Sequence, residues 1–345
     1  MKIIVDAMGG DNAPLAFLDG AFQAAKECSV DIVLVGRVEQ LLELMKKKGI
    51  ETLPKGVELM DAEDVVDMHD DPANVVKTRR NSSMLVGLRL LAEGGGDAFV
   101  SAGSTGALLS AATLVVKRVR GIRRAAFGPT IPTKTGRMIL IDSGANVECT
   151  PEFLLQFGIM GAFYAKRTLR IEEPRVGLLN NGTEDSKGDP LRKESYALLQ
   201  AAGEKGTIHF IGNVEARDAM LGVCDVLVCD GFSGNVFLKG VEGTALFMGS
   251  LLKKMFKTNL RTKLGYLLCK NSVKELAATL DYKQVGGTAL IGISKPVIKA
   301  HGSADAETVV SAIRQAVLTV NSGICDSIRD HIDEMTLPRG IGDHA

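Results

Sequence analysis

Residues 2–11 read KIIVDAMGGD, a short apolar segment that ends in two glycines and an aspartate. Residues 2–7 are typical of a buried β-strand, and Pro14 then begins a helical pattern that extends to about Glu27. A second apolar strand follows at 31–35, and a helix rich in Leu and Lys extends from there to Lys48. A strand, a helix and a second strand in this order predict a βαβ unit with parallel strands.

The same alternation continues along most of the chain. We expect helices at 81–93, 103–117, 151–167, 190–202 and from Ser233 onward, and strands at 97–101, 138–141, 175–179, 208–211 and 226–229. Right-handed crossovers place the carboxyl ends of parallel strands on one edge of a sheet, and open α/β folds bind ligands at that edge. The pattern therefore predicts an α/β fold with its ligand site on one sheet edge.

Length and composition restrict the class of protein. The chain has 345 residues, of which 46% are hydrophobic and 24% charged, so it can form one large α/β domain or two ordinary ones. Lys plus Arg and Asp plus Glu are both 41, and Trp is absent, so nothing favours nucleic acid as a partner. The cysteines form no CxxC pair and no metal-ligand spacing. With no signal peptide and no apolar run of about 18 residues, these features indicate a reduced cytoplasmic protein.

Several polar loops that contain glycine follow predicted strands. They lie at 6–11, 101–106, 142–146, 180–188, 212–217, 230–235 and 300–303. Backbone N–H groups at the start of a helix bind anions well, and the loops at 103–106 and 231–235 are the best candidates for such a site. Glycine after a strand is often only a turn residue, so the inference depends on how many of these loops share one predicted edge.

Common nucleotide and nucleophile motifs are missing. The Gly9-Gly10 pair is not part of a GxGxxG fingerprint, and no GxxxxGK[ST] motif occurs, so a dinucleotide or a nucleoside triphosphate is not expected. No GxSxG elbow is present either. Cys229 ends a predicted strand without a nearby His, and we interpret it as a core residue.

Acidic residues allow a metal site as an alternative. Carboxylates that surround Lys187 or end strands are Asp6, Asp11, Asp142, Glu184, Asp185, Asp189 and Asp230. They could bind Mg²⁺, as in metal-dependent decarboxylating dehydrogenases, but strand-end aspartates commonly cap loops and no pair has a diagnostic spacing. We expect no metal and no cofactor. His301 could contact an anion or satisfy a carbonyl.

The loop motifs together resemble the bacterial phosphate acyltransferases of fatty acid and phospholipid synthesis, which move an acyl group from acyl carrier protein to phosphate. The resemblance extends from Asp6 to Gly302 and rests on DAMGGD at 6–11, SAGSTGA at 101–107, GNVEARD at 212–218 and CDGFSGN at 229–235. The sequence departs from the family at Ser104, usually Asn, and at 286–290, where GGTAL replaces the start of GGAPLLG.

The resemblance implies a Rossmann-like three-layer α/β/α fold with a mostly parallel sheet, related to phosphotransacetylases and isocitrate dehydrogenases. It also implies a homodimer with its site near the interface, contact with the inner face of the cell membrane, and acyl carrier protein and inorganic phosphate as substrates. The downstream glycerol-3-phosphate acyltransferase is a further partner to consider.

The catalytic residues implied by the family are Lys187 and Asn235. Phosphate is already a nucleophile, so the reaction needs a cation, N–H donors and a donor to the thioester oxyanion. Lys187 could supply the charge or be a solvated surface residue, and Asn235 could donate to the oxyanion or only cap its helix. The predicted phosphate- and substrate-binding residues are Asp6, Gly9, Gly10, Asp11, Gly103, Ser104, Thr105, Gly106, Asp142, Asn146, Asp230, Gly231, Ser233, Gly234 and His301.

Residues 241–284 form a basic and apolar segment. No acidic residue lies between Glu242 and Glu275, where the basic residues are Lys253, Lys254, Lys257, Arg261, Lys263, Lys270 and Lys274. The apolar stripes fit two amphipathic helices that break near Thr258-Asn259 better than one helix. We expect a helical hairpin inserted into an α/β core of 1–240 and 285–336, followed by a tail at 337–345.

This hairpin could pack against a dimer mate, contact anionic lipid, or attract the acidic carrier protein. We favour a dimer contact combined with membrane contact through Leu251, Leu252, Met255, Phe256, Leu260 and Leu264. Two further functions remain open: a metal- and NAD-dependent decarboxylating dehydrogenase of the same fold, and a non-enzymatic scaffold at the membrane surface.

Overall fold

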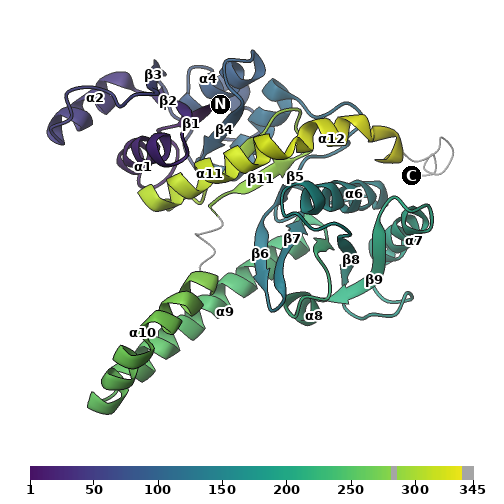
Figure 1. The fold of residues 1–345 in the computed structure, drawn as a ribbon. Coiled ribbons are helices and arrows are strands. Elements are labelled where there is room, and N and C mark those ends of the chain that lie inside the picture. The colour runs from purple at the N-terminus through teal and green to yellow at the C-terminus, as the bar shows by residue number, and fades with distance from the viewer. Residues whose placement is uncertain (281–285, 336–345) are drawn as a thin grey trace.

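The computed structural model describes residues 1–280 and 286–335, and it contains two mixed β-sheets (Figure 1). The predicted tail at 337–345 lies outside the described residues. The first sheet has the order β3-β2-β1-β4-β12-β11-β5, with β1 (Lys2–Asp6), β2 (Asp31–Gly36), β3 (Val57–Asp61), β4 (Ala98–Ser101), β5 (Ala126–Gly128), β11 (Thr288–Ile291) and β12 (Val297–Lys299). The second has the order β6-β7-β10-β8-β9, with β6 (Thr130–Thr133), β7 (Gly136–Ile141), β8 (Arg175–Asn180), β9 (His209–Glu215) and β10 (Val226–Val228).

Helices connect most of the parallel strands, as the alternating pattern predicts. In the first half of the chain they are α1 (Leu15–Glu27), α2 (Val38–Lys47), α3 (Val75–Thr78), α4 (Ser83–Ala92), α5 (Thr105–Ala111), a π-helical turn (Ala112–Val116) and α6 (Pro151–Arg167). In the second half they are α7 (Pro190–Glu204), α8 (Ala216–Met220), α9 (Gly231–Lys257), α10 (Leu260–Leu280), α11 (Ala306–Ser322), α12 (Ile324–Asp330) and a 3₁₀ turn (Ile332–Met335).

Alternate residues of the central strands face opposite helical layers. On β1, Ile3 and Val5 belong to one buried cluster with α1 and α11, whereas Ile4 belongs to a second cluster with α4 and α5. This follows from the two-residue period of side chains along a strand. Strands buried on both faces are typical of parallel sheets covered by helices, so the first sheet forms the middle of three layers.

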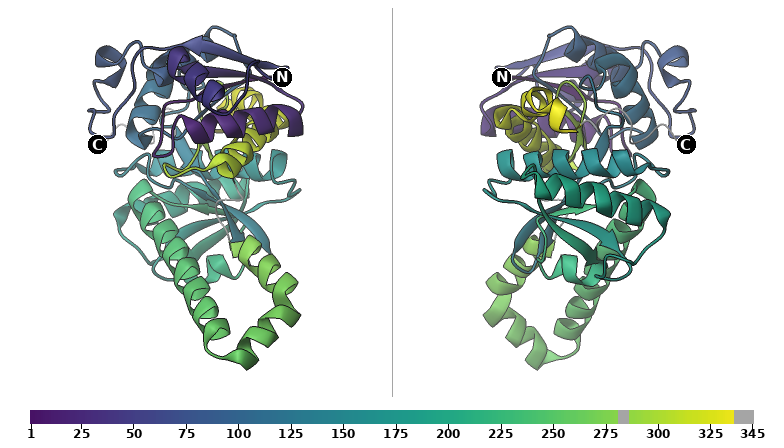
Figure 2. Two further views of the ribbon diagram at one scale, coloured as in Figure 1. Left: turned by 90° about the vertical axis from the view of Figure 1, so that its left-hand side faces the viewer. Right: turned by 90° about the vertical axis from the view of Figure 1, so that its right-hand side faces the viewer.

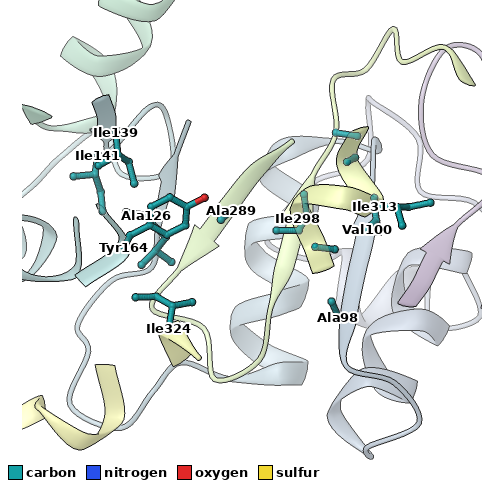
Figure 3. Packing of buried hydrophobic residues seen from close by; sticks show 14 of the residues in the cluster. Ala98, Val100, Ala126, Ile139, Ile141, Tyr164, Ala289, Ile298, Ile313 and Ile324 are labelled. Carbon is teal, nitrogen blue, oxygen red and sulfur yellow. The ribbon is translucent and has the colours of Figure 1, made fainter. Parts of the chain in front are cut away.

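One hydrophobic core joins the two sheets. The cluster on the α1 side of the first sheet continues into the second sheet through Ile139 and Ile141 of β7, with Tyr164 of α6 between them and Ala289 of β11 (Figure 3). Tyr164 is fully enclosed, and its hydroxyl accepts a hydrogen bond from the Gln315 amide at 2.7 Å. The two sheets are therefore parts of one packed body.

The division into two sheets corrects the prediction of a single sheet edge. The chain leaves β5 at Gly128, passes Pro129, and enters β6 of the second sheet. Proline has no N–H to continue a ladder, which favours a change of sheet at this point. The predicted loops consequently belong to two sheets. How close the loops of one sheet come to those of the other depends on how the two sheets pack.

The basic segment forms a helical hairpin that projects from the second sheet (Figures 1 and 2). Its turn lies between the end of α9 at Lys257 and the start of α10 at Leu260, which confirms the predicted break. The predicted domain boundary at 241 lies inside α9, so the hairpin is a continuous extension of a core helix. No helix in the described part of the chain is long and apolar enough to cross a membrane.

Candidate active site

A cavity of about 770 Å³ lies between the loops of the two sheets. The polar residues of its lining include Thr105, Ser143, Asn235, Lys299 and His301, and also Lys134, Lys239 and Glu242. The apolar residues include Phe127, Ile131, Pro132, Leu238, Val241 and Ala245. The volume is in the usual range for small-molecule sites, and a mostly apolar lining with a few polar groups is also typical of them.

Asp6 fixes the loops of the first sheet. Its buried carboxylate accepts hydrogen bonds from Met8 N at 3.1 Å and from Ser101 Oγ at 2.7 Å, and Ser101 Oγ in turn accepts one from Gly103 N. Burial raises the pKa of Asp6, and these hydrogen bonds oppose the rise. A Cβ at Gly9 would lie 2.7 Å from Gly103 N, so the glycine permits the two loops to touch.

Asp142 has the same structural role in the second sheet. Its carboxylate accepts hydrogen bonds from Phe127 N at 3.0 Å, Ala145 N at 3.1 Å and Asn146 N at 2.7 Å. Burial raises the pKa of Asp142, and these hydrogen bonds oppose the rise. The Asn146 carbonyl then accepts a hydrogen bond from Gly231 N at 2.7 Å, which joins this loop to the start of α9.

The first turn of α9 holds Asn235 at the cavity. Asp230 caps the helix by accepting hydrogen bonds from Ser233 N at 2.9 Å and Ser233 Oγ at 2.8 Å. A Cβ at Gly234 would lie 1.9 Å from the Asp142 carbonyl oxygen, so only glycine permits this contact. Asn235 is consequently placed beside Gly144, and both line the cavity.

Lys187 lies on an exposed loop after β8. The loop is held by hydrogen bonds from the Asn180 amide to the Lys187 carbonyl at 3.2 Å and from the Asn213 amide to the Glu184 carbonyl at 2.7 Å. The Lys187 side chain packs across Gly182, and it is not among the described residues that line the cavity. The structure therefore does not bring Lys187 into the same wall as Asn235.

Of the predicted site residues, Thr105, Asn235 and His301 line the cavity. The others lie outside the cavity lining, in the surrounding loops and strand ends and in the first turns of α5 and α9: Asp6, Gly9, Gly10, Asp11, Gly103, Ser104, Gly106, Asp142, Asn146, Asp230, Gly231, Ser233 and Gly234. Several of them hold loops together, as when Asp11 N donates to the Gly302 carbonyl at 2.8 Å. The carboxylates of Asp6, Asp142 and Asp230 accept hydrogen bonds from other protein groups, so these three residues shape the site.

Lys299 and Ser143 line the cavity without having been predicted. Lys299 ends the three-residue strand β12, which the sequence pattern did not identify. Its position in the sequence could have indicated a site residue, because Lys299 follows the apolar pair Val297-Ile298 and directly precedes Ala300-His301. Within the described ranges, no group of three or more His, Cys, Asp or Glu residues is placed to share a metal ion.

The hairpin exposes many of its apolar side chains. Phe256 and Tyr266 pack against each other between the two helices, with ring centroids 5.4 Å apart. In contrast, Leu260 and Leu264 are 77% and 62% exposed. Of the predicted membrane residues, Leu251 and Met255 are also exposed, whereas Leu252 and Phe256 are partly covered.

Comparison with known proteins places the chain in a family. The model of the family described as fatty acid synthesis protein matches residues 1–327. The phosphate acyltransferase of Thermoanaerobacterium thermosaccharolyticum is 43% identical over 333 residues, which cover 96% of this chain and 97% of the relative. The phosphate acyltransferase of Bacillus cereus is 42% identical over 339 residues, which cover 98% of this chain and all of the relative (100%).

Solved structures show the same fold at low sequence identity. The EutD phosphotransacetylase from Staphylococcus aureus superposes with a TM-score of 0.59 at 16% identity, over 94% of each chain. A branched-chain phosphotransacylase from Enterococcus faecalis superposes with a TM-score of 0.56 at 14% identity, over 93% of this chain and 100% of the other. These likenesses confirm the predicted relation to the phosphotransacetylase fold. The match over residues 1–327 and the full-length relatives establish that the chain belongs to the fatty acid synthesis protein family, among relatives named phosphate acyltransferase.

Proposed function

We propose that this chain is an acyltransferase that moves a fatty acyl group from the thioester of acyl carrier protein to inorganic phosphate. Its relatives at 42–43% identity carry the name phosphate acyltransferase. The observation that carries the proposal is the mixed cavity, in which the polar residues Thr105, Asn235 and His301 line the same space as the apolar residues Leu238 and Val241. The polar residues suit an anion and a carbonyl group, and the apolar residues suit an acyl chain.

The reaction is a substitution at the thioester carbonyl. An oxygen of hydrogen phosphate attacks the carbonyl carbon, the carbon–sulfur bond breaks, and the carrier thiolate leaves and takes up the proton from phosphate. The products are acyl phosphate and the free carrier thiol. Asn235 is placed to donate its amide to the oxyanion that forms on the carbonyl oxygen, where a fixed donor stabilises the transition state more than the ground state.

Lys187 keeps the role that the family resemblance implies, which is to orient phosphate. Its loop is exposed and follows β8 of the second sheet, so Lys187 reaches the cavity only if residues 181–188 move toward it. A catalytic loop that closes on its substrate is common among enzymes. The charge would then approach phosphate after the substrates are bound.

The direct test uses purified protein, palmitoyl-acyl carrier protein and inorganic phosphate. We expect thiol release that depends on phosphate, together with an acyl phosphate that hydroxylamine traps as the hydroxamate. Thiol release that is the same without phosphate would contradict the proposal and indicate a thioesterase. Reduction of NAD with a 2-hydroxy acid, without acyl phosphate, would instead support the dehydrogenase alternative.

We also propose that the chain acts as a homodimer at the inner face of the cell membrane, with acyl carrier protein as a partner and the glycerol-3-phosphate acyltransferase as the consumer of its product. Support for the membrane contact comes from the exposed Leu260 and Leu264 beside the basic residues of the hairpin. Apolar side chains flanked by lysines bind anionic lipid surfaces through both burial and charge.

A further inference from the structure

Lys299 is a cation in the cavity wall, and it forms no ion pair within the described part of the chain. It ends β12, which pairs with β4 so that Lys299 lies opposite Ser101, next to the loop at 101–106. Its Nζ donates hydrogen bonds to the carbonyl oxygens of Ala102, at 3.3 Å, and Ala300. An ammonium group has three donors, so these two carbonyls leave one donor for another acceptor.

The charges of Asp6 and Asp11 both act on Lys299. None of the ion pairs found among the described residues includes Lys299. Of these two residues, Asp6 has a carboxylate that accepts hydrogen bonds from Met8 N and Ser101 Oγ. Burial lowers the pKa of Lys299 to about 8, although the charges of Asp6 and Asp11 oppose this. A desolvated cation is costly unless an anion compensates it, and an anion in the cavity would do so.

The surroundings of Lys299 fit a small oxyanion. Thr105, at the start of α5, and His301, two residues after Lys299 in the chain, line the same cavity. A hydroxyl, an imidazole and an ammonium group are all able to donate hydrogen bonds to phosphate oxygens. Asn235 lines this cavity from the second sheet, so an anion near Lys299 shares the cavity with the donor proposed for the oxyanion.

We propose that Lys299 is the cation that binds inorganic phosphate in this cavity, through a hydrogen bond from its Nζ to a phosphate oxygen. The inference rests on the proposed function and names a binding residue for its nucleophile. Lys187, after the loop movement proposed above, and Lys299, in the cavity lining, would then contact the anion at different stages.

The test compares Lys299→Gln with Lys295→Gln. Glutamine keeps an N–H donor for the backbone carbonyls and removes the charge. Lys295 is a matched control because its Nζ also donates to a backbone carbonyl, that of Leu91 at 2.8 Å, and because it does not belong to the cavity wall among the described residues. Binding of inorganic phosphate alone is measured by isothermal titration calorimetry, and folding is checked by circular dichroism.

We expect Lys299→Gln to weaken phosphate binding at least about tenfold, as expected for loss of a charge-assisted hydrogen bond, and Lys295→Gln to change it less than about twofold. In turnover, the KM for phosphate should rise with Lys299→Gln while the KM for the acyl carrier substrate stays within about twofold. Unchanged phosphate binding, or a rise only in the KM for the carrier, whose prosthetic group also contains a phosphate, would overturn the proposal.

A second measurement needs no variant. Amine acetylation of the unmodified protein near pH 8 is followed at Lys299 and Lys295 by mass spectrometry, with and without inorganic phosphate. We expect phosphate to slow the acetylation of Lys299 several-fold and to leave the acetylation rate of Lys295 unchanged. The same rate of acetylation at Lys299 with and without phosphate would overturn the proposal. Both binding measurements omit the acyl donor, so a failure of acyl transfer and a failure of the Lys299 assignment are distinguishable.

Discussion

Arg192 joins the loop that carries Lys187 to the helix that carries Asn235. Its guanidinium donates to Asp189 Oδ2 at 2.7 Å, to Ser233 Oγ at 2.8 Å, and to the carboxylate of Asp230. The Arg192 and Asp230 side chains are only 14% and 7% exposed. Because such a pair is shielded from water, removing one partner leaves an uncompensated charge on the other.

We predict that Arg192→Met lowers the free energy of unfolding by about 3 kcal/mol at pH 7, measured by urea denaturation. The control is Arg329→Met, which breaks an exposed pair with Asp326 and should cost less than about 1 kcal/mol. Equal losses in the two variants would contradict the structural role of Arg192.

The same pair predicts a pH dependence. Burial raises the pKa of Asp230, but the hydrogen bonds from Ser233 and the Arg192 charge outweigh it, so the pKa lies below its ordinary value of 3.8. A carboxyl with a depressed pKa in the folded state contributes stability above its unfolded pKa and loses it as the pH falls through the folded pKa. The difference in the free energy of unfolding between the parent protein and Arg192→Met should therefore be largest near pH 7, and it should become smaller below pH 3.8.

Asn235→Ala tests the oxyanion donor. We predict that kcat for acyl phosphate formation falls about 10²–10³-fold, as for other single oxyanion donors, while phosphate binding by calorimetry changes little. Val236→Ala, at the exposed neighbour on the same helix, is the control and should keep kcat within about twofold. A loss of less than about fivefold in Asn235→Ala would exclude this role.

At this scale, the sequence predicts those site residues whose loops carry their own local signal. Thr105 and Asn235 lie in glycine loops at helix starts, and His301 precedes Gly302. Lys299 could not be predicted in the same way, because its place in the cavity depends on the pairing of β12 with β4, a strand far away in the sequence. The exposed position of Lys187 is likewise set by how its loop folds over β8 and β9.

Among the elements, α9 connects the site to the hairpin. Its first turn approaches the Asp142 carbonyl at Gly234, and its far end reaches Lys257 at the hairpin turn. Gly240, by comparison, has open space where a Cβ would lie. A side chain is therefore tolerated at Gly240 but not at Gly234, although both lie on α9.

We predict that Gly234→Ala destabilises the fold by about 2–3 kcal/mol through overpacking against Asp142. Because the helix start must shift, Asn235 moves and turnover should fall on the order of 10²-fold. Gly240→Ala should keep turnover and gain up to about 1 kcal/mol from helix propensity. Thermal unfolding and the acyl phosphate assay check both variants, and similar behaviour of the two would refute the close approach at Gly234.

Long periodic elements were predictable, whereas only some of the short strands were. The predicted helix at 151–167 matches α6 (Pro151–Arg167), because its length and the proline at its start are strong signals. The strands β5 and β12 have only three residues each, too few for a two-residue period to appear. Without them, the sequence does not reveal the antiparallel pairs that complete the first sheet.

The whole molecule combines a two-sheet body with a projecting hairpin (Figure 2). The mixed cavity lies between loops of the two sheets, and α9 leads from its wall into the hairpin. The α/β class, the helical hairpin and its break were predicted from alternation and amphipathic pattern. The division into two sheets was not, because it depends on the packing of distant segments such as Ile139 and Ala289 (Figure 3).

We predict that Leu260→Glu combined with Leu264→Glu lowers binding to phosphatidylglycerol vesicles at least about tenfold, measured by cosedimentation. Binding should also weaken as salt rises, because the basic residues of the hairpin contribute by charge. Leu42→Glu, at a 48% exposed leucine on α2 far from the hairpin, is the control and should bind as the parent protein does. Loss of vesicle binding in the control alone, or unchanged binding in the double variant, would contradict the membrane contact.

The central claim is that phosphate itself attacks the acyl thioester. Mass spectrometry of the product made from palmitoyl-acyl carrier protein and phosphate labelled with ¹⁸O at all four oxygens tests it most directly. We predict an acyl phosphate that keeps all four labelled oxygens, because the bridging oxygen comes from phosphate, with one carrier thiol released for each product formed. Unlabelled palmitate with released thiol, and no acyl phosphate, would show that water is the nucleophile and would contradict the account.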